Sequence, residues 1–142
     1  MKVIQYPEAP VHVFDSHPAK GVTGRVVIGK DDGAGNFCMR IFELAPGGHT
    51  PCHTHAWEHE IFVHAGKGQV LRNGAWEDIE KANVVFIPGN EEHQFRNTGG
   101  QHPCLCLPHS RRSTGNLSRG KQKPISQWIP SHWGLPILSI FK

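Results

Sequence analysis

Residues 47–68 read Gly-Gly-His-Thr-Pro-Cys-His-Thr-His-Ala-Trp-Glu-His-Glu-Ile-Phe-Val-His-Ala-Gly-Lys-Gly, and the interpretation of the chain depends on this stretch. His53 and His55 are two residues apart. On a β-strand this spacing directs both imidazoles to the same face. A carboxylate follows at Glu60, and a distant segment supplies His93. Three imidazoles and one carboxylate form a mixed nitrogen and oxygen donor set that suits one divalent transition ion: Fe, Mn, Ni, Co or Zn.

Short strand-like segments separated by tight turns fill the first 107 residues. Asn73-Gly74 predicts a two-residue type I′ hairpin turn. No segment of helical length carries an apolar stripe of period 3.6. The chain is therefore expected to be all-β, with strands spaced for a small barrel or sandwich. The expected strands cover residues 11–14, 22–29, 37–44, 60–65, 68–72, 75–79, 84–87, 92–97 and 104–107.

Two motifs in this order resemble those of the cupin family, specifically a small single-domain bacterial cupin. The first family motif reads Gly, five residues, His-x-His, three or four residues, Glu, six residues, Gly. Here Gly47 is followed after five residues by His53 and His55, and four residues separate His55 from Glu60. Gly66 then follows after five residues instead of six.

The second family motif reads Gly, five residues, Pro-x-Gly, two residues, His, three residues, Asn. Here Pro88, His93 and Asn97 keep their places, while Ala82 and Asn90 replace glycines. Asparagine tolerates positive φ better than most residues, so the turn at Asn90 is expected to form. The resemblance covers about residues 20–107.

The resemblance implies a double-stranded β-helix, the cupin or jelly-roll barrel, for residues 1–107. It also implies that one divalent metal ion is the cofactor and that His53, His55, Glu60 and His93 are its ligands. Relatives of this kind are commonly homodimers that bind a small molecule.

Four neighbouring residues are not expected to be metal ligands. Glu58 departs from the family spacing. His49 and His59 are interpreted as surface or loop residues. Cys52 is expected to face away from the ion, because its strand neighbours alternate with the two ligand histidines.

The same alternation predicts the residues of a pocket. It places Phe62 and His64 on the side of the carboxylate ligand, and Phe95 and Asn97 on the side of the histidine in the second motif. Phe62 and Phe95 would form an apolar wall near the ion.

Two further pocket candidates carry alternative interpretations. His64 is either a donor behind the ligands or the end of a strand at the barrel mouth, and we favour the strand end. Arg40 either holds a substrate carboxylate or points outward into solvent, and we favour the outward position.

Composition agrees with one ordinary domain of 142 residues. The sequence has no run of 18 apolar residues and no secretory apolar core at its start, so we expect no membrane partner. Its four cysteines show no paired disulfide or zinc spacing, which makes the cytoplasm the expected compartment.

The charge is distributed unevenly along the chain. Residues 1–107 hold nine Lys or Arg and all 12 Asp or Glu, a net charge of −3, whereas residues 108–142 hold six Lys or Arg and no acid. A basic tail usually suggests a nucleic-acid partner. We expect none here, because a tail translated out of frame from about residue 102 would carry no selected nucleic-acid function.

The site chemistry suits several functions. A metal-dependent enzyme, an oxygenase or a lyase or isomerase acting on a small oxygen-rich or anionic metabolite, is the favoured interpretation. A non-catalytic metal-containing module that binds or senses a small molecule is the alternative, because fold and ligands alone do not select a reaction.

The C-terminal extension motivates a hypothesis about the gene: residues from about 102 onward are translated out of frame. The codons of residues 102–110, re-read one nucleotide downstream, can encode Ile-Pro-Ala-Phe-Val-Cys-Leu-Ile-Pro, the terminal strand expected of the family. Removing residues 111–142 should then leave metal binding unchanged, as measured by metal content. Coding DNA that cannot yield this strand in the shifted frame would end the hypothesis.

Overall fold

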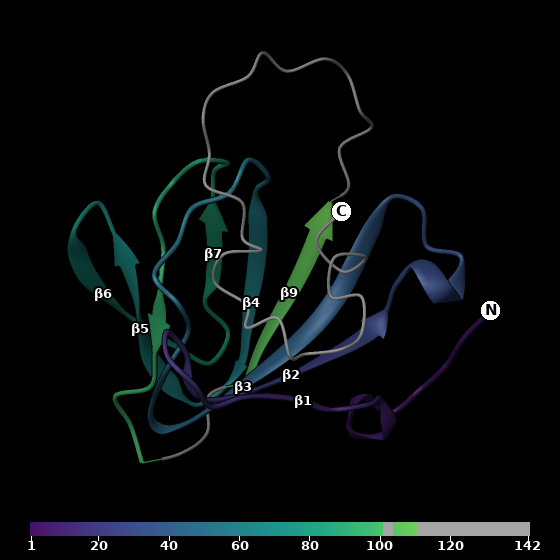
Figure 1. Cartoon of the computed structure of the whole chain (residues 1–142), viewed down its shortest axis with the longest axis horizontal. Coiled ribbons are helices and arrows are strands. Elements are labelled where there is room, and N and C mark those ends of the chain that lie inside the picture. Colours follow the sequence, from purple (N-terminus) through teal and green to yellow (C-terminus); the bar gives the residue numbers. More distant parts are fainter. Residues whose placement is uncertain (101–103, 111–142) are drawn as a thin grey trace.

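The computed structural model describes residues 1–100 and the backbone of residues 104–110. The expectations for residues 101–103 and 111–142, including most of the C-terminal extension, lie outside this part of the chain. Strands wrap around one interior, and two 3₁₀ turns, η1 (Tyr6–Glu8) and η2 (Lys30–Asp32), interrupt them (Figure 1). The strands are β1 (His12–Phe14), β2 (Lys20–Ile28), β3 (Phe37–His49), β4 (His59–Ala65), β5 (Lys67–Arg72), β6 (Ala75–Glu80), β7 (Val84–Ile87), β8 (Phe95–Arg96) and β9 (Cys104–Ser110).

Antiparallel pairing joins these strands in the order β6-β5-β8-β3-β9-β4-β7, while β2 pairs with β3 and β1 pairs with β2. The long strand β3 pairs with β2 along one edge and with β9 and β8 along the other. In Figure 1, β9 lies between β3 and β4, and the β5–β6 hairpin stands at the opposite side of the molecule. β9 continues to Ser110, three residues beyond the predicted end of the barrel.

The core is built from inward-facing side chains of nearly every strand. Leu44, Ile61 and Val63 are the most deeply buried large side chains of the described residues. Burying such aliphatic side chains contributes roughly 1.5–3 kcal/mol each relative to exposure. The remaining members of this cluster are Val22, Val70, Ile79, Ile87 and Phe95. Because they come from β2, β5, β6, β7 and β8, the strands enclose one interior, as a double-stranded β-helix requires.

Turn chemistry explains how the chain reverses between strands. Asn73 and Gly74 have φ values of 50° and 77°, which confirms the predicted two-residue hairpin between β5 and β6. Asn90 has φ of 69°, as expected for asparagine in place of the family glycine. Ala82 has φ of 72° and takes the same conformation at a cost of about 1 kcal/mol or more, since its Cβ is crowded there.

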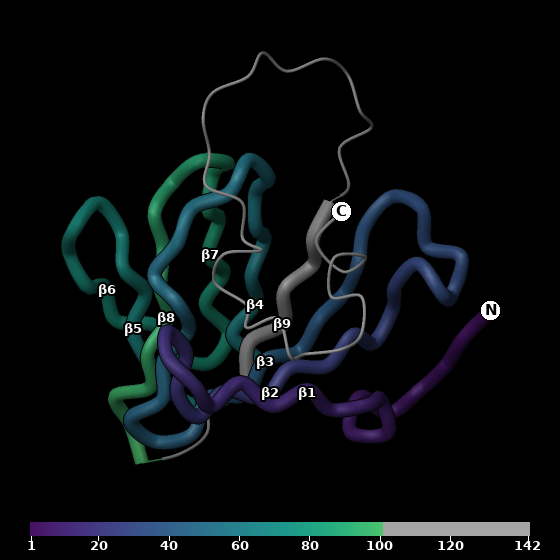
Figure 2. The backbone as a smooth tube through the Cα atoms, viewed as in Figure 1, coloured from purple at the N-terminus to yellow at the C-terminus, as the bar shows by residue number. Residues whose placement is uncertain are grey.

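The all-β prediction and the jelly-roll barrel are confirmed, while the strand boundaries shifted by a few residues. β8 is only two residues long, and the histidines before β4 lie in a loop instead of a strand. The path of the chain is clearest in Figure 2, where β8 lies next to β5. No helix in the described part of the chain has the length and hydropathy needed to cross a membrane.

Candidate metal centre

Two segments that are distant in sequence meet at one backbone bridge. His53 and His93 face each other as an isolated antiparallel pair. The amide of His53 donates to the carbonyl of His93 over 3.2 Å, and the amide of His93 donates back over 3.0 Å. This pair of hydrogen bonds fixes the Cα atoms of His53 and His93 relative to each other, and so fixes where the two side chains begin.

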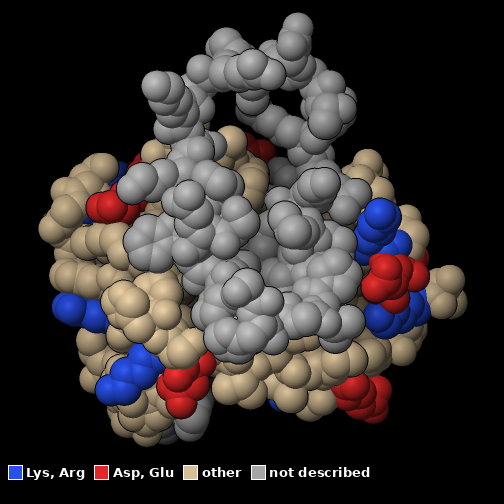
Figure 3. Space-filling view, viewed as in Figure 1, with Lys and Arg blue, Asp and Glu red and all other residues tan. Residues whose placement is uncertain are grey.

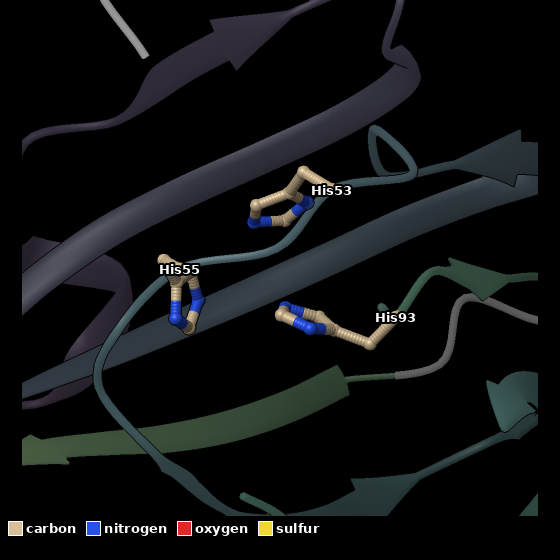
Figure 4. A group of neighbouring side chains, drawn as sticks. All are labelled: His53, His55 and His93. Carbon is tan, nitrogen blue, oxygen red and sulfur yellow. The ribbon is translucent and has the colours of Figure 1, made fainter. Parts of the chain in front are cut away.

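Three imidazoles converge at this bridge. The ligand nitrogens of His53, His55 and His93 all lie within 4.8 Å of one another. Figure 4 shows the three rings turned toward a common space, two from one loop and the third from the opposite segment. Two nitrogens on opposite sides of a metal ion lie about 4.2 Å apart. Small rotations of the rings therefore bring all three onto one ion.

Each of these imidazoles is oriented by its own chain. The Nδ1 atom of each ring lies within hydrogen-bond distance of a backbone carbonyl oxygen. Because a carbonyl oxygen can only accept, each Nδ1 carries the proton and each Nε2 keeps its lone pair for a metal. In each case the accepting carbonyl lies two residues away in the sequence. The three bonds run from His53 to Pro51 (3.0 Å), from His55 to Trp57 (2.8 Å) and from His93 to Glu91 (2.9 Å).

Electrostatics also favours the neutral, ligating form. Desolvation by burial lowers the pKa of His53, although the Pro51 carbonyl opposes this effect. Burial lowers the pKa of His93 to about 4. Both imidazoles are therefore uncharged at neutral pH. Nε2 of His93 is buried and has no hydrogen-bond partner, which is the state expected of a nitrogen held ready for a metal ion.

A fourth histidine, which the sequence analysis assigned to the surface, lies at the same place. His59 is 8% exposed. Its Nε2 is 2.7 Å from Nε2 of His55, and its ring centroid is 4.5 Å from that of His55 and 5.2 Å from that of His93. Adjacent nitrogens on one ion lie about 3 Å apart. His59 is thus close enough to His55 and His93 to be a candidate fourth nitrogen donor.

The inward face of β4 is the opposite of the one predicted. Burial along this strand alternates so that His59, Ile61 and Val63 are buried. The expectation that Phe62 and His64 face the interior is wrong, because both are exposed and Phe62 retains 45% of its surface. The physical reason is the period of two: one residue of offset exchanges the two faces of a strand.

Glu60 lies on the same outward face of β4 as Phe62 and His64. It is half-buried, and the structure does not place it with the three clustered histidines. The sequence contains the signal that distinguishes it from His59. Counted from His59, three residues separate it from His55 and six from Gly66, and both counts fit the family motif. Counted from Glu60, the second interval is one residue short.

The other sequence-predicted residues have different positions. Phe95 faces the interior as predicted and packs in the main core cluster. Asn97 is buried as predicted, and its amide donates to the carbonyl of Leu44 over 2.9 Å, so it ties β3 to the segment after β8. Arg40 is buried, which corrects the expectation of a solvated side chain.

Cys52 lies outside the cluster, as the alternation predicted. Its side chain is exposed. Desolvation and the neighbouring Glu92 carboxylate raise the pKa of its thiol. The thiolate needed to bind a metal is therefore disfavoured at this position.

The loop that carries His55 is held in place by Trp57 and by the turn of the second motif, and we call these contacts the clamp. Trp57 stacks on the His55 ring at 4.3 Å between centroids and 12° between planes. The amide of Asn90 donates to the His55 carbonyl over 2.6 Å. A Cβ at Gly89 would collide with the Ala56 carbonyl oxygen and lie 3.0 Å from its carbon. Only glycine lets the turn of the second motif approach this loop.

The geometry and the motifs agree with what comparison with known proteins finds. The cupin domain pattern matches residues 40–109. This barrel is a cupin domain. The polyketide cyclase RemF from Streptomyces resistomycificus is 29% identical, with a TM-score of 0.73 over 92% of this chain and 94% of that one. A cupin 2 conserved barrel protein from Rhodopseudomonas palustris is 27% identical, with a TM-score of 0.64 over 79% of both chains.

A curated relative of this cupin is also known. It is 1-methylthio-D-xylulose 5-phosphate methylsulfurylase from Rhodospirillum rubrum, 29% identical over 103 residues. The match covers 72% of this chain and 65% of the relative. This cupin therefore spans less than two thirds of the curated relative's length.

Single substitutions separate the two candidate fourth ligands. We expect His59→Ala to weaken metal binding more than about tenfold because it removes a donor, and Glu60→Gln to leave it unchanged. His53→Ala and His93→Ala should reduce it severely, whereas Cys52→Ala should not. Competition with a chromophoric chelator measures each affinity. Full occupancy in His93→Ala, or a larger loss in Glu60→Gln than in His59→Ala, contradicts this assignment.

The clamp on the ligand loop gives a second expectation. Gly89→Ala should displace the Ala56 carbonyl, and with it His55, and so lower metal affinity by about 10- to 100-fold. The matched control is Gly35→Ala, since a Cβ at Gly35 meets nothing within 4 Å. Isothermal titration with Zn²⁺ compares the two variants. Wild-type affinity in Gly89→Ala would show that the clamp does not position the ligand.

Proposed function

We propose that this cupin is a divalent-metal-dependent enzyme that promotes enolisation of a small, oxygen-rich carbonyl compound, leading to a lyase- or cyclase-type reaction. The observation that carries the proposal is the convergence of His53, His55 and His93, with His59 beside the last two and no carboxylate of the described residues in the group. Imidazole donors suit Zn, Cu, Fe and Ni. Four neutral donors leave the full charge of a divalent ion available to a bound anion.

The donor count supports two-point binding of the substrate. Four protein ligands leave about two positions on an octahedral ion. When bound, the ion supplies Lewis-acid polarisation of a carbonyl oxygen. The three Nδ1–H bonds to backbone carbonyls would keep the imidazoles facing the ion. An enolisable 1,3-dicarbonyl compound fits this arrangement, because its two oxygens bind side by side.

The relatives support the same class of substrate. One acts on a polyketide, as its name states, and the other on a 5-phosphate of a ketose. Both names describe carbonyl compounds rich in oxygen, which can enolise. The shared chemistry, and neither particular substrate, is what we carry over to this chain.

An Fe(II) oxygenase is the less favoured enzyme. Such enzymes commonly use two histidines and one carboxylate with open positions. In the described part of this chain, the carboxylate candidate Glu60 lies on the outward side of β4. A binding or sensing module would use the same ligands and differ only in lacking turnover.

The partner and compartment remain proposals. A small-molecule ligand follows from the site, and we retain the homodimer and the cytoplasm as expectations from the sequence. We also retain the expectation of no nucleic-acid partner; around the edge of the face shown in Figure 3, described basic and acidic side chains lie beside one another.

The proposal is tested by hydrogen exchange in a substrate surrogate. Metal content is measured first. The loaded protein is then mixed in D₂O with a 1,3-diketone, and loss of the α-proton signal is followed by NMR. We expect at least about 100-fold acceleration over buffer, absent in His93→Ala. Saturable binding without acceleration would indicate a binding module, and O₂ consumption would indicate an oxygenase.

A further inference from the structure

The outer face of β4 and β7 is unusually apolar. Phe62, Val84 and Phe86 expose 45%, 75% and 61% of their surface. Phe62 pairs directly with Val84, and Phe86 pairs with Glu60, which has the parity of Phe62. Residues that pair across strands share a face. The three side chains therefore form one patch, which we call the β4–β7 patch.

This patch lies at an open edge of the sheet. β7 ends the strand order, and its residues Val84–Ile87 carry no charge. Natural edge strands are usually protected by charges, bulges or a covering segment. The described residues provide no charge on β7, and a strand of four residues leaves its edge and outer face open to a covering segment.

We propose that residues 125–141 of this chain fold back onto the β4–β7 patch of the same molecule. The sequence of this segment is apolar, with Trp128, Trp133 and the run Leu-Pro-Ile-Leu-Ser-Ile-Phe at 135–141. It is too short to bury these side chains in a core of its own.

The chain leaves β9 close to the patch, so the linker has only a short distance to span. β9 ends at Ser110 and pairs with β4, which in turn pairs with β7. Residues 111–124 form a linker of 14 residues, which spans up to about 45 Å. Two strand spacings amount to about 10 Å. The linker therefore reaches the patch from the end of β9.

The size of the patch favours a single segment over a second subunit. Three partly exposed side chains present on the order of 300 Å² of apolar surface, whereas a stable dimer buries roughly 800 Å² on each partner. One strand or turn of chain covers an area of this size.

Charge favours the same occupant. Five of the six Lys or Arg of residues 111–142 precede the segment 125–141 and the sixth is Lys142, so basic residues flank the segment, and residues 1–107 carry a net charge of −3. Glu60 lies within the outer face beside Phe86 and offers a local anionic contact. The contact depends on composition alone, so it holds whether or not the reading frame shifted.

Hydrogen exchange with mass spectrometry on the full-length chain tests the contact. We expect amides of residues 125–141 to exchange at least about tenfold more slowly than in the isolated peptide, independently of protein concentration. Val84→Glu combined with Phe86→Glu should return them to the free rate. The matched control is Val13→Glu, on the 54% exposed Val13 of β1, which should leave the protection intact.

A reciprocal variant guards against misfolding of the barrel. Trp128→Ser combined with Trp133→Ser should speed exchange in residues 84–87 while metal binding stays unchanged. Free exchange of residues 125–141 in the wild-type chain overturns the proposal. So does protection that falls on dilution, which would place the segment on a partner copy. Persistent protection of residues 84–87 in a dimer of the tryptophan variant would assign the patch to a second subunit.

Discussion

The backbone bridge between His53 and His93 is the constraint on which the candidate site depends. Two short loops from different parts of the barrel exchange amide hydrogen bonds at this one pair. Both loops then turn their imidazoles inward, with Nδ1 tied to a nearby carbonyl. The site therefore needs no long side-chain network, because the main chain itself sets the position and the tautomer of each ligand. The fold brings the loops together, and the loops orient the donors.

Around this bridge, the second motif supports the first through the backbone. Asn90 holds the His55 carbonyl, and Gly89 permits the close approach. Asn97 joins β3 to the chain after β8. These contacts explain why a glycine stands at position 89 and a residue that tolerates positive φ stands at position 90. We therefore expect metal affinity to depend on local backbone geometry in this cupin, so that a substitution outside the ligand cluster weakens it.

The sequence predicted the barrel, most strands, the hairpin at Asn73, and the three histidines that meet. These features follow from local turn chemistry and from motif order, which a sequence displays directly. The inward face of β4 was mispredicted because parity cannot be carried through a loop. Residues 53–58 are not a continuous strand, so the period of two does not link His55 to β4. The count from His59 to Gly66 was the better guide, since it lies within one strand and its turn.

X-ray absorption at the edge of the bound metal tests the central claim most directly, because it counts and identifies the atoms around the ion. The account predicts a first shell with four imidazole nitrogens at about 2.0–2.1 Å, with the outer-ring scattering of four imidazoles. It also predicts that one imidazole is lost in His59→Ala and that the spectrum of Glu60→Gln equals that of the wild type. A shell with three imidazoles and a carboxylate oxygen that disappears in Glu60→Gln would contradict the account.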